Sequence, residues 1–257
     1  MASWLTGPVY ALYTHRLRRR VRQGPVPRHI GLIMDGNRRW ARHKGMVSPS
    51  VGHRYGAEHV DDVLEWCRAT GIEHVTVFVC SAENLQRRGD EEVAYLMGVI
   101  EDVVTERLTK GNEHWRVHIA GSLDVLPDST AHALKRAVEQ TRTREKGHIT
   151  LAVGYGGRQE LVEAMREHLY VNGDKSPRDI AAALTMDDIT DRLYTAGRPD
   201  PDLVIRTSGE QRMSNFLLWQ SAYAELYFCE AYWPAFREVD FLRALRSYAQ
   251  RQRRHGA

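Results

Sequence analysis

Four apolar runs in the sequence each end in a group of polar residues that could bind an anion or move a proton. Ligands of open α/β proteins bind beyond the carboxyl ends of the strands, so polar groups at several such ends would share one site. The four groups are Asp35-Gly36-Asn37-Arg38-Arg39, Ser81-Ala82-Glu83-Asn84, Tyr155-Gly156-Gly157-Arg158 and Arg206-Thr207-Ser208-Gly209-Glu210. We therefore expect one site on a rim built from four strand ends.

The segment from Asp35 to Arg39 has the composition of a phosphate-binding turn. A glycine directly after a strand lets backbone N–H groups approach an anion, and the start of a following helix adds a positive dipole. Arg39 would donate two hydrogen bonds to phosphate oxygens. Asp35 would repel a phosphate unless a cation intervenes, and Mg²⁺ favours one or two carboxylates together with phosphate oxygens. A capping aspartate followed by solvated arginines is the alternative interpretation.

A second set of phosphate-binding candidates follows a later strand. Arg206, Arg212 and Ser214 lie around Gly209, and Glu225 begins the last apolar run. Glu225 is a candidate for a second metal ligand. Each residue alone could form a surface ion pair or cap a helix. Together with the acidic turn described above, the set predicts chemistry on diphosphates with a bound Mg²⁺.

Six short β-rich runs alternate with helical patterns along the chain. This order predicts a single α/β domain with a central, mainly parallel six-stranded sheet flanked by helices. Strands buried on both faces are continuously apolar, as these runs are. The runs are His29–Met34, His74–Cys80, Trp115–Ala120, His148–Val153, Asp202–Arg206 and Glu225–Cys229.

Three apolar stripes at helical spacing predict helix faces directed at the core. The middle stripe is also a candidate wall for an apolar tunnel, although its spacing fits an ordinary core face equally well. The stripes are Val60, Val63, Leu64 and Cys67; Val93, Leu96, Met97, Ile100, Val103 and Val104; and Leu161, Val162 and Met165. The segment 171–178 contains Asn172, Gly173 and Pro177 and predicts a surface loop.

Composition fits one globular domain, with 42% apolar and 27% charged residues among 257. Cys67, Cys80 and Cys229 lie far apart in apolar stretches, which predicts reduced thiols and a cytoplasmic protein. No run reaches the roughly 18 apolar residues that a membrane span needs.

Positive charge gathers near the start of the chain. Residues 1–44 contain ten lysines or arginines and one acid, Asp35. Such a segment could be a solvated arm or could meet nucleic acid, a diphosphate or an anionic membrane. Few aromatics interleave the basic residues, so we expect no nucleic-acid partner. Peripheral contact with the inner face of the membrane is a further hypothesis, based on apolar residues that precede Arg16–Arg22, namely Trp4, Leu5, Val9, Tyr10 and Leu12.

Several long motifs resemble those of the cis-prenyltransferases, the group that contains undecaprenyl diphosphate synthase. The resemblance runs from about Pro27 to the end of the chain, which suggests a basic extension over residues 1–26 and a catalytic domain over 27–257. The motifs are His29–Trp40, Ser81–Asn84, Gly154–Arg158, Asp202–Glu210, Ser214–Gln220 and Ala224–Leu226.

This resemblance implies a homodimer that condenses isopentenyl diphosphate with an allylic diphosphate in the presence of Mg²⁺. It implies that Asp35 is catalytic and binds the metal, with Glu225 as a further ligand beside the partner subunit. Asn84 matches the position assigned to proton removal, although an amide is a poor base and could instead orient a phosphate oxygen or water. The implied substrate contacts are Gly36, Asn37, Arg38, Arg39, Trp40 and His53 for the allylic diphosphate; Ser81, Ala82, Glu83, Leu85 and Arg87 near Asn84; and Arg206, Arg212, Met213 and Ser214 for isopentenyl diphosphate.

Departures from the long-chain pattern point to a short product. Leu85 stands where long-chain members usually have tryptophan, Gln211 where histidine is frequent, and the segment 46–51 lacks a common arginine, which Arg42 or Lys44 could replace. These features resemble the actinobacterial enzymes that make (2Z,6E)-farnesyl diphosphate from geranyl diphosphate. Val79 is a bulky candidate for the residue that limits chain length. A long-chain polyprenyl diphosphate synthase is the alternative.

Two other classes compete with this interpretation. Asp61-Asp62 and Asp187-Asp188 imitate the DDxxD metal motif of trans-prenyltransferases, but those enzymes are all-helical and neither acidic pair follows a β-rich run. A non-catalytic accessory subunit of a prenyltransferase complex would lack the catalytic aspartate, which is present here as Asp35.

Overall fold

The chain folds around one parallel sheet. The computed structural model describes residues 6–87, 89–111 and 113–251. Its six strands lie in the order β3-β4-β2-β1-β5-β6, and each neighbouring pair is parallel. All six predicted strands form, and the predicted α/β architecture is confirmed. The strands are β1 His29–Ile33, β2 His74–Ser81, β3 Trp115–Ala120, β4 Gly147–Tyr155, β5 Leu203–Arg206 and β6 Glu225–Phe228.

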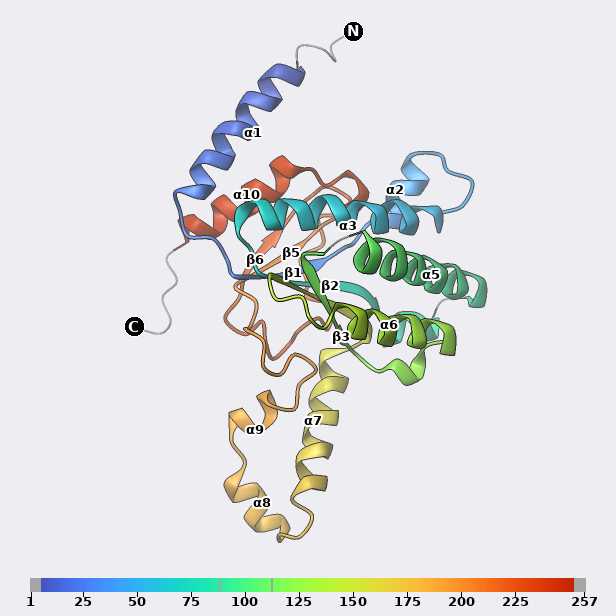
Figure 1. Cartoon of the computed structure of the whole chain (residues 1–257), viewed down its shortest axis with the longest axis vertical. Helices are drawn as coiled ribbons and strands as arrows, with labels where there is room; N and C mark the ends of the chain where they lie inside the picture. Colours follow the sequence, from blue (N-terminus) through green and yellow to red (C-terminus); the bar gives the residue numbers. More distant parts are fainter. Residues whose placement is uncertain (1–5, 88, 112, 252–257) are drawn as a thin grey trace.

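Helices follow most strands and cover the sheet (Figure 1). The α-helices are α1 Thr6–Arg22, α2 Asn37–His43, α3 Val51–Thr70, α4 Ala82–Arg87, α5 Asp90–Asp102, α6 Asp128–Thr141, α7 Gly157–Val171, α8 Pro177–Ala183, α9 Met186–Thr190 and α10 Glu238–Gln250. A π-helix, η1 Val103–Lys110, continues α5, and two short 3₁₀ turns are η2 Leu123–Val125 and η3 Trp233–Ala235.

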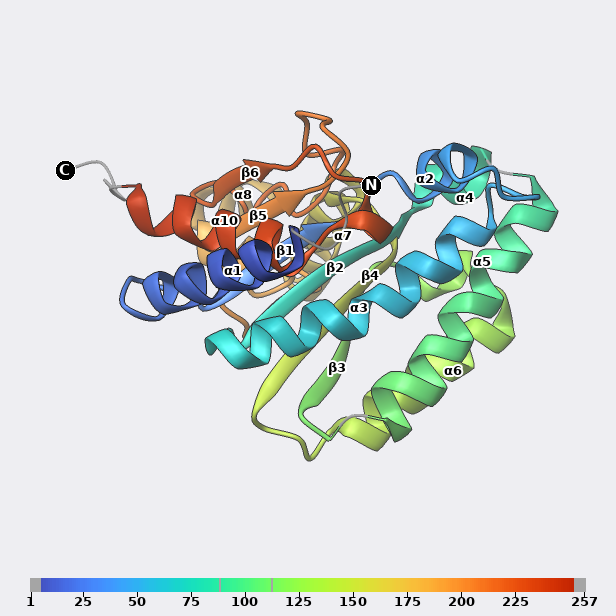
Figure 2. The ribbon, with the colours of Figure 1, turned by 90° about the horizontal axis from the view of Figure 1, so that it is seen from above.

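Two apolar cores lie on the two faces of the sheet. Because side chains alternate along a strand, Ile30 and Leu32 of β1 enter the larger core, whereas Ile33 enters the smaller one with Tyr155 and Phe216. Figure 2 shows α3, α5 and α6 together on one side of the strands, and these helices supply much of the larger core. Two of the predicted helix stripes, those on α3 and α5, are confirmed as buried faces.

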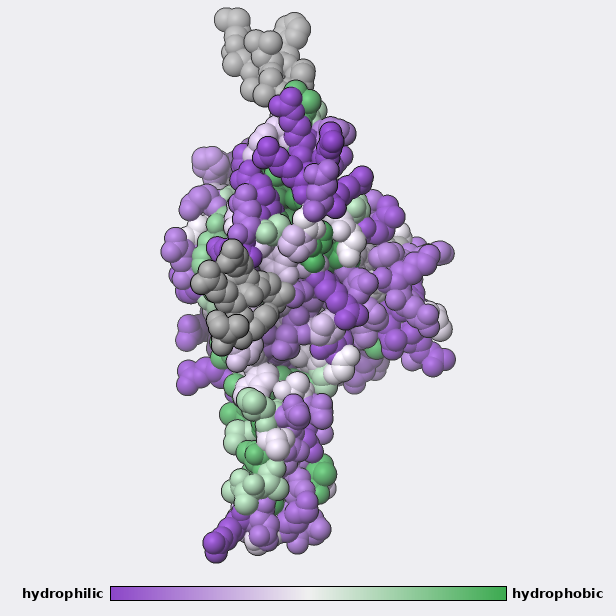
Figure 3. Space-filling view, turned by 90° about the vertical axis from the view of Figure 1, so that its left-hand side faces the viewer, coloured by the Kyte–Doolittle hydropathy of each residue, from purple (hydrophilic) through white to green (hydrophobic). Residues whose placement is uncertain are grey.

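The third predicted stripe is wrong at two of its three residues, since only Leu161 packs against a buried cluster. Helices α7, α8 and α9 project from the sheet as an arm (Figure 1). On α7 the buried residues include Ala164 and His168, whereas Val162 and Met165 are 44% and 49% exposed. Apolar side chains therefore gather on the surface of the arm, as Figure 3 shows. The predicted loop 171–178 also ends early, because Ser176 caps α8 and Pro177 begins it.

Helix α1 packs along α10 and buries Leu17 and Val21 in the larger core. Leu12 and Tyr13 remain exposed beside its basic residues. Trp4 and Leu5, which the membrane hypothesis also used, lie outside the described residues. No helix in the described ranges is long and apolar enough to cross a bilayer.

Helices α2 and α3 approach each other closely at two glycines of α3. A Cβ atom on Gly52 would lie 2.1 Å from the carbonyl oxygen of Asn37, and one on Gly56 would lie 2.1 Å from its Oδ1. Trp233 Nε1 donates a 2.7 Å hydrogen bond to the carbonyl oxygen of Gly56. The spacing of these glycines therefore sets the position of α2, which carries part of the candidate site.

We expect Gly56→Ala to lower the free energy of unfolding by about 1–3 kcal/mol, because the new methyl group overpacks this contact. Gly98→Ala is the matched control, since Gly98 is an exposed helical glycine with open space around its Cβ position. It should raise stability by about 0.5–1 kcal/mol. Urea unfolding of both variants measures the difference, and equal effects would refute the close-contact explanation.

Candidate active site

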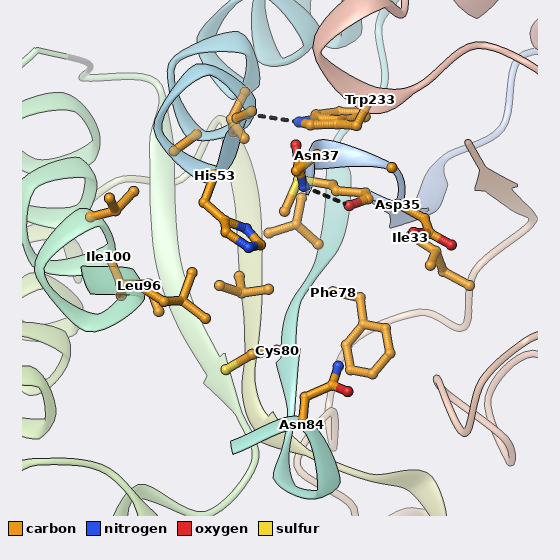
Figure 4. Close-up of a pocket in the computed structure, with 18 of the residues that line it drawn as sticks. Ile33, Asp35, Asn37, His53, Phe78, Cys80, Asn84, Leu96, Ile100 and Trp233 are labelled. Atoms are coloured by element: carbon orange, nitrogen blue, oxygen red, sulfur yellow. Dashed lines mark hydrogen bonds between the residues drawn. The ribbon is translucent and has the colours of Figure 1, made fainter. Parts of the chain in front are cut away.

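A cavity of about 560 Å³ opens beyond the carboxyl ends of β1, β2 and β5. Its mouth is polar and its interior apolar. The polar lining residues include Asp35, Asn37, Arg38, Arg39, Arg42, His53, Ser81, Asn84, Arg206, Arg212 and Ser214, and Gly36 lines it with its backbone. Three of the four predicted strand ends therefore meet at one site (Figure 4).

Asp35 is held between two arginines at this mouth. Its Oδ2 accepts a 2.8 Å hydrogen bond from Arg206 and its Oδ1 a 3.1 Å bond from Arg39. Burial alone would raise the pKa of the Asp35 carboxyl, but the hydrogen bonds and charges of Arg206 and Arg39 outweigh burial and lower it. Asp35 is therefore a carboxylate at neutral pH. Its two arginine neighbours are also suitable hydrogen-bond donors to the oxygens of a polyphosphate.

Arg206 connects this carboxylate to the following loop. It is only 4% exposed, and besides Asp35 it donates to the carbonyl oxygen of Arg212 and to Ser214 Oγ at 2.7 Å. The loop contains four non-glycine residues with positive φ: Ser208, Ser214, Asn215 and Leu217. Such backbone is strained and persists only where surrounding contacts impose it. The structure therefore fixes Arg206, Arg212 and Ser214 as one group.

Gly36 turns the chain from β1 into α2 with a φ of 97°. A Cβ atom at this position would lie 2.6 Å from Tyr232 Cδ1, so both the conformation and the space require glycine. The turn brings Asn37, Arg38 and Arg39 to the cavity, as the sequence predicted. Asn37 Nδ2 donates a 3.0 Å hydrogen bond to the carbonyl oxygen of Met34, which orients its side chain (Figure 4).

Glu92 of α5 lies beside Arg38 and His53. Its Oε1 is 3.3 Å from Arg38 Nη1 and 3.8 Å from His53 Nε2. Arg42 also lines the cavity, whereas Lys44 does not. Of these two candidates for the missing arginine, only Arg42 lies in the cavity wall.

Ser81 and Asn84 reach the cavity from the end of β2. Ser81 Oγ accepts the backbone N–H of Asn84 at 3.0 Å, which fixes the first turn of α4. The Asn84 side chain lies near Phe78 at the cavity wall (Figure 4). Glu83 points elsewhere, because its Oε1 accepts a 3.0 Å hydrogen bond from Asn215.

Several predicted substrate contacts are not among the residues that line the cavity. Trp40 packs against Tyr55 with ring centroids 5.1 Å apart, Leu85 packs on the larger core, and Met213 packs on the smaller one. Ala82, Glu83 and Arg87 also lie outside the lining. Trp40 lies on α2, Met213 lies in the loop after β5, and Ala82, Glu83, Leu85 and Arg87 belong to α4.

Glu225 does not meet Asp35 within one chain. It begins β6 in register with Leu203, whereas Asp35 follows Ile33, which is in register with Arg206 at the other end of β5. Glu225 forms an ion pair with Arg251 instead. Its assignment as a metal ligand therefore stays a prediction that requires a neighbouring subunit.

The apolar interior is formed by four residues of the predicted second stripe and by residues that sequence patterns alone did not single out. Val79, Phe78 and Cys80 of β2 form part of the wall. Met34, Ala57 and Trp233 also line the cavity, but nothing in their spacing signals a site. The helical part of the wall consists of Leu96, Val99, Ile100, Val103, Val104 and Leu108 on α5 and the π-helix.

Both acidic pairs that imitate a metal motif have structural partners away from the cavity. Asp61 of α3 accepts a hydrogen bond from Arg107, and Asp188 accepts the backbone N–H of Thr185 as part of the cap of α9. The prediction that these are ordinary helix acids agrees with these contacts.

Comparison with known proteins identifies the family. The family model described as putative undecaprenyl diphosphate synthase matches residues 33–256, which include every residue of the cavity lining. The chain belongs to this family. It is a cis-prenyltransferase, and the resemblance inferred from its motifs is confirmed.

Relatives of this cis-prenyltransferase match it over nearly its whole length. An isoprenyl transferase from Streptomyces fradiae is 69% identical over 96% of this chain and 97% of the relative. A (2Z,6E)-farnesyl diphosphate synthase from Mycolicibacterium smegmatis is 51% identical over 98% of this chain and 97% of the relative. The solved structure of lavandulyl diphosphate synthase from Lavandula x intermedia, in complex with dimethylallyl diphosphate, is 32% identical with a TM-score of 0.83 over 90% of this chain and 99% of that one.

We expect Arg206→Gln to raise the pKa of Asp35, because it removes the strongest hydrogen bond and charge that oppose the effect of burial. Arg212→Gln is the control, since Arg212 pairs with Glu210 and not with Asp35. Carbon-13 NMR of the aspartate carboxyl carbons, followed as a function of pH, measures the shift. An unchanged Asp35 titration in Arg206→Gln would contradict the assigned cause.

Proposed function

We propose that this cis-prenyltransferase condenses isopentenyl diphosphate with geranyl diphosphate to give a short Z-isoprenyl diphosphate, (2Z,6E)-farnesyl diphosphate. The observation that carries the proposal is the cavity of about 560 Å³, which joins a cationic mouth at Asp35 to an apolar interior. A diphosphate fits the mouth and a hydrocarbon chain fits the chamber. The names of close relatives, such as the M. smegmatis enzyme, support the same product.

The two diphosphates would occupy two groups of donors that meet at Asp35. Arg38, Arg39 and His53, with the backbone of Gly36 and Asn37, would bind the allylic diphosphate. Arg206, Arg212 and Ser214 would bind isopentenyl diphosphate. The Asp35–Arg206 ion pair lies between these groups, so the reacting ends of the two substrates would face each other there.

Asp35 fits the role of a Mg²⁺ ligand that works with substrate phosphates. Among the described residues no cluster of three His, Cys, Asp or Glu could hold a metal alone. Mg²⁺ commonly binds one or two protein carboxylates and takes its other ligands from phosphate and water, and Asp35 lines the cavity as such a carboxylate. When bound, the ion would stabilise negative charge on the departing diphosphate.

The chain's own residues would then guide the reaction. Arg39 and Arg38 would stabilise the charge that develops on the leaving diphosphate as the allylic C–O bond breaks. The apolar wall would keep water from the carbocation that remains. After the new C–C bond forms, a proton must leave, and Asn84 with Ser81 would orient the diphosphate oxygen or water that accepts it.

Val79 would limit the length of the product. It lies in the part of the cavity wall that is formed by β2. A growing chain that meets this side chain could not extend further without displacing the core against which Val79 packs. The packing of Val79 in the sheet would therefore set the length of the hydrocarbon product.

We also propose a homodimer that works in the cytoplasm, with contact to a membrane surface. The exposed apolar side chains of the arm, which include Met165, Leu169 and Met186, suit an interface between two copies. In such a dimer Glu225 could reach the partner's site. The exposed Leu12 and Tyr13 beside Arg16 and Arg19 of α1 support peripheral membrane contact.

We expect Asp35→Asn to lower the rate of prenyl transfer about a thousandfold or more, because the neutral amide binds Mg²⁺ weakly and no longer balances the arginines. The assay supplies labelled isopentenyl diphosphate and Mg²⁺ with dimethylallyl, geranyl or farnesyl diphosphate, and reads product length and double-bond geometry. Asp187→Asn is the control and should keep full activity.

Each outcome of this assay bears on one part of the proposal. Incorporation from geranyl diphosphate with a C15 Z-product would support it. Long products would overturn the short-chain assignment and favour a polyprenyl diphosphate synthase. No incorporation with any primer would refute the enzyme reaction and favour an accessory subunit.

Val79→Ala should lengthen the product by at least one isoprene unit, because it removes two methyl groups from the cavity wall. Val75→Ala is the matched control: Val75 is buried in the same strand but does not line the cavity. Chromatography of the dephosphorylated products measures the change. If both variants made the wild-type product, Val79 would not set its length.

A further inference from the structure

A second cleft lies at the amino ends of β2, β3 and β4. Asp35 lies beyond the opposite, carboxyl ends of the strands. Figure 2 shows this edge at the far end of the strands from α2 and α4. Among the described residues that line the cleft, none is acidic. The side chains with ionisable groups are Arg28, His74, Arg116, His118, His148 and Arg198.

Strand register aligns these side chains. His29 is paired with His74, His74 with His148, and His148 with Arg116, so one row crosses four neighbouring strands. Residues in register on parallel strands point to the same face of the sheet. The rings of His74 and His148 stack accordingly, with centroids 4.7 Å apart.

A chain of hydrogen bonds orients the histidines nearest the cleft. Arg198 Nη1 donates to His118 Nδ1 at 3.3 Å, and His118 Nε2 lies 3.0 Å from His148 Nδ1. Because His118 accepts at Nδ1, its neutral ring carries the proton on Nε2 and donates to His148. His148 then carries its own proton on Nε2, where it can donate to a bound anion.

Positive charge in the cleft exceeds negative charge. Arg28 pairs with Glu73 at 2.7 Å, but neither Arg116 nor Arg198 lies within ion-pair distance of a carboxylate in the part of the chain that the structure describes. Asp202 accepts the backbone N–H groups of Arg28 and His29, and Asp200 follows the lining residue Pro199. The charge of Glu160 acts on Arg198 from outside the cleft. Two guanidinium groups therefore face the same small space without a carboxylate in direct contact.

This environment keeps the histidines neutral. Burial, followed by the charges of Arg198, His148 and Arg116, lowers the pKa of His118 to about 3. Burial and the neighbouring rings lower that of His74 to about 4. A bound anion would reverse these electrostatic contributions, so anion binding and histidine protonation would favour each other.

We propose that this cleft binds a small multivalent oxyanion of the phosphate class, such as inorganic phosphate or diphosphate. Planar guanidinium groups donate paired hydrogen bonds to phosphate oxygens, and Arg116 supplies one such group. Arg198 already donates from Nη1 to His118 and from Nη2 to the carbonyl oxygen of Tyr194, so it would contribute its remaining N–H groups and its charge. His148 supplies a further donor and Arg28 a further positive charge at the rim. The site is separate from the cavity at Asp35, and the inference does not depend on the proposed function.

The test titrates inorganic phosphate, and separately inorganic diphosphate, into the full chain with nitrogen-15 labelled histidine rings and without added metal. Ring signals of His118 and His148, assigned with His118→Gln and His148→Gln variants, distinguish this cleft from the Asp35 cavity. We expect saturable shifts of both signals and an upward movement of their pKa values. Arg116→Gln and Arg198→Gln should each weaken binding about tenfold or more.

Arg136→Gln, an exposed arginine of α6, is the matched control and should leave the affinity unchanged. Arg116 is only half-buried, so its variant tests the proposal even if Arg198→Gln fails to fold. A stronger response to diphosphate than to phosphate would support a multivalent ligand. Unshifted His118 and His148 signals at millimolar anion, or equal weakening by Arg136→Gln, would overturn the proposal.

Discussion

The ion pair between Asp35 and Arg206 is the interaction on which the active site depends. A guanidinium as deeply buried as that of Arg206 is costly to keep in a protein unless a carboxylate and further acceptors surround it. Asp35, Ser214 and the carbonyl oxygen of Arg212 meet that requirement. One buried cation thus orients Asp35, the proposed Mg²⁺ ligand, and holds the loop that carries the proposed binding group for isopentenyl diphosphate. It also joins the ends of β1 and β5.

The two faces of the sheet have different tasks. The larger core surrounds the apolar wall of the cavity, whereas the smaller core anchors the strained loop after β5 through Phe216 and Leu217, both fully buried. Asn215 adds polar anchors, since its carbonyl oxygen accepts the N–H of Gly157 and its side chain bonds Arg158 and Glu83. The Gly154–Arg158 motif therefore supports the site indirectly and contributes no side chain to the cavity.

Much of this arrangement could be predicted from the sequence, because strands buried on both faces have continuous apolar runs and their polar ends converge by topology. Asp35, Arg206 and Ser81 were found in this way. Register is harder to predict. Glu225 was predicted as a second metal ligand without knowledge of the register, and the alignment of β6 with β5 separates it from Asp35 within the chain. Burial on α7 was mispredicted because the spacing of apolar residues along a helix does not reveal whether another element packs on that face.

The π-helix that continues α5 has a consequence for how the cavity could change during evolution. A π-helix closes i→i+5 hydrogen bonds in place of the i→i+4 bonds of an α-helix, so each hydrogen-bonded loop contains one residue more. Val103, Val104 and Leu108 of this segment line the cavity. Loss or gain of one residue would rotate the following side chains around the helix axis and present a different set to the chamber. The length of the hydrocarbon that fits could thus be altered by one small deletion or insertion, while the sheet and the phosphate-binding residues stay in place.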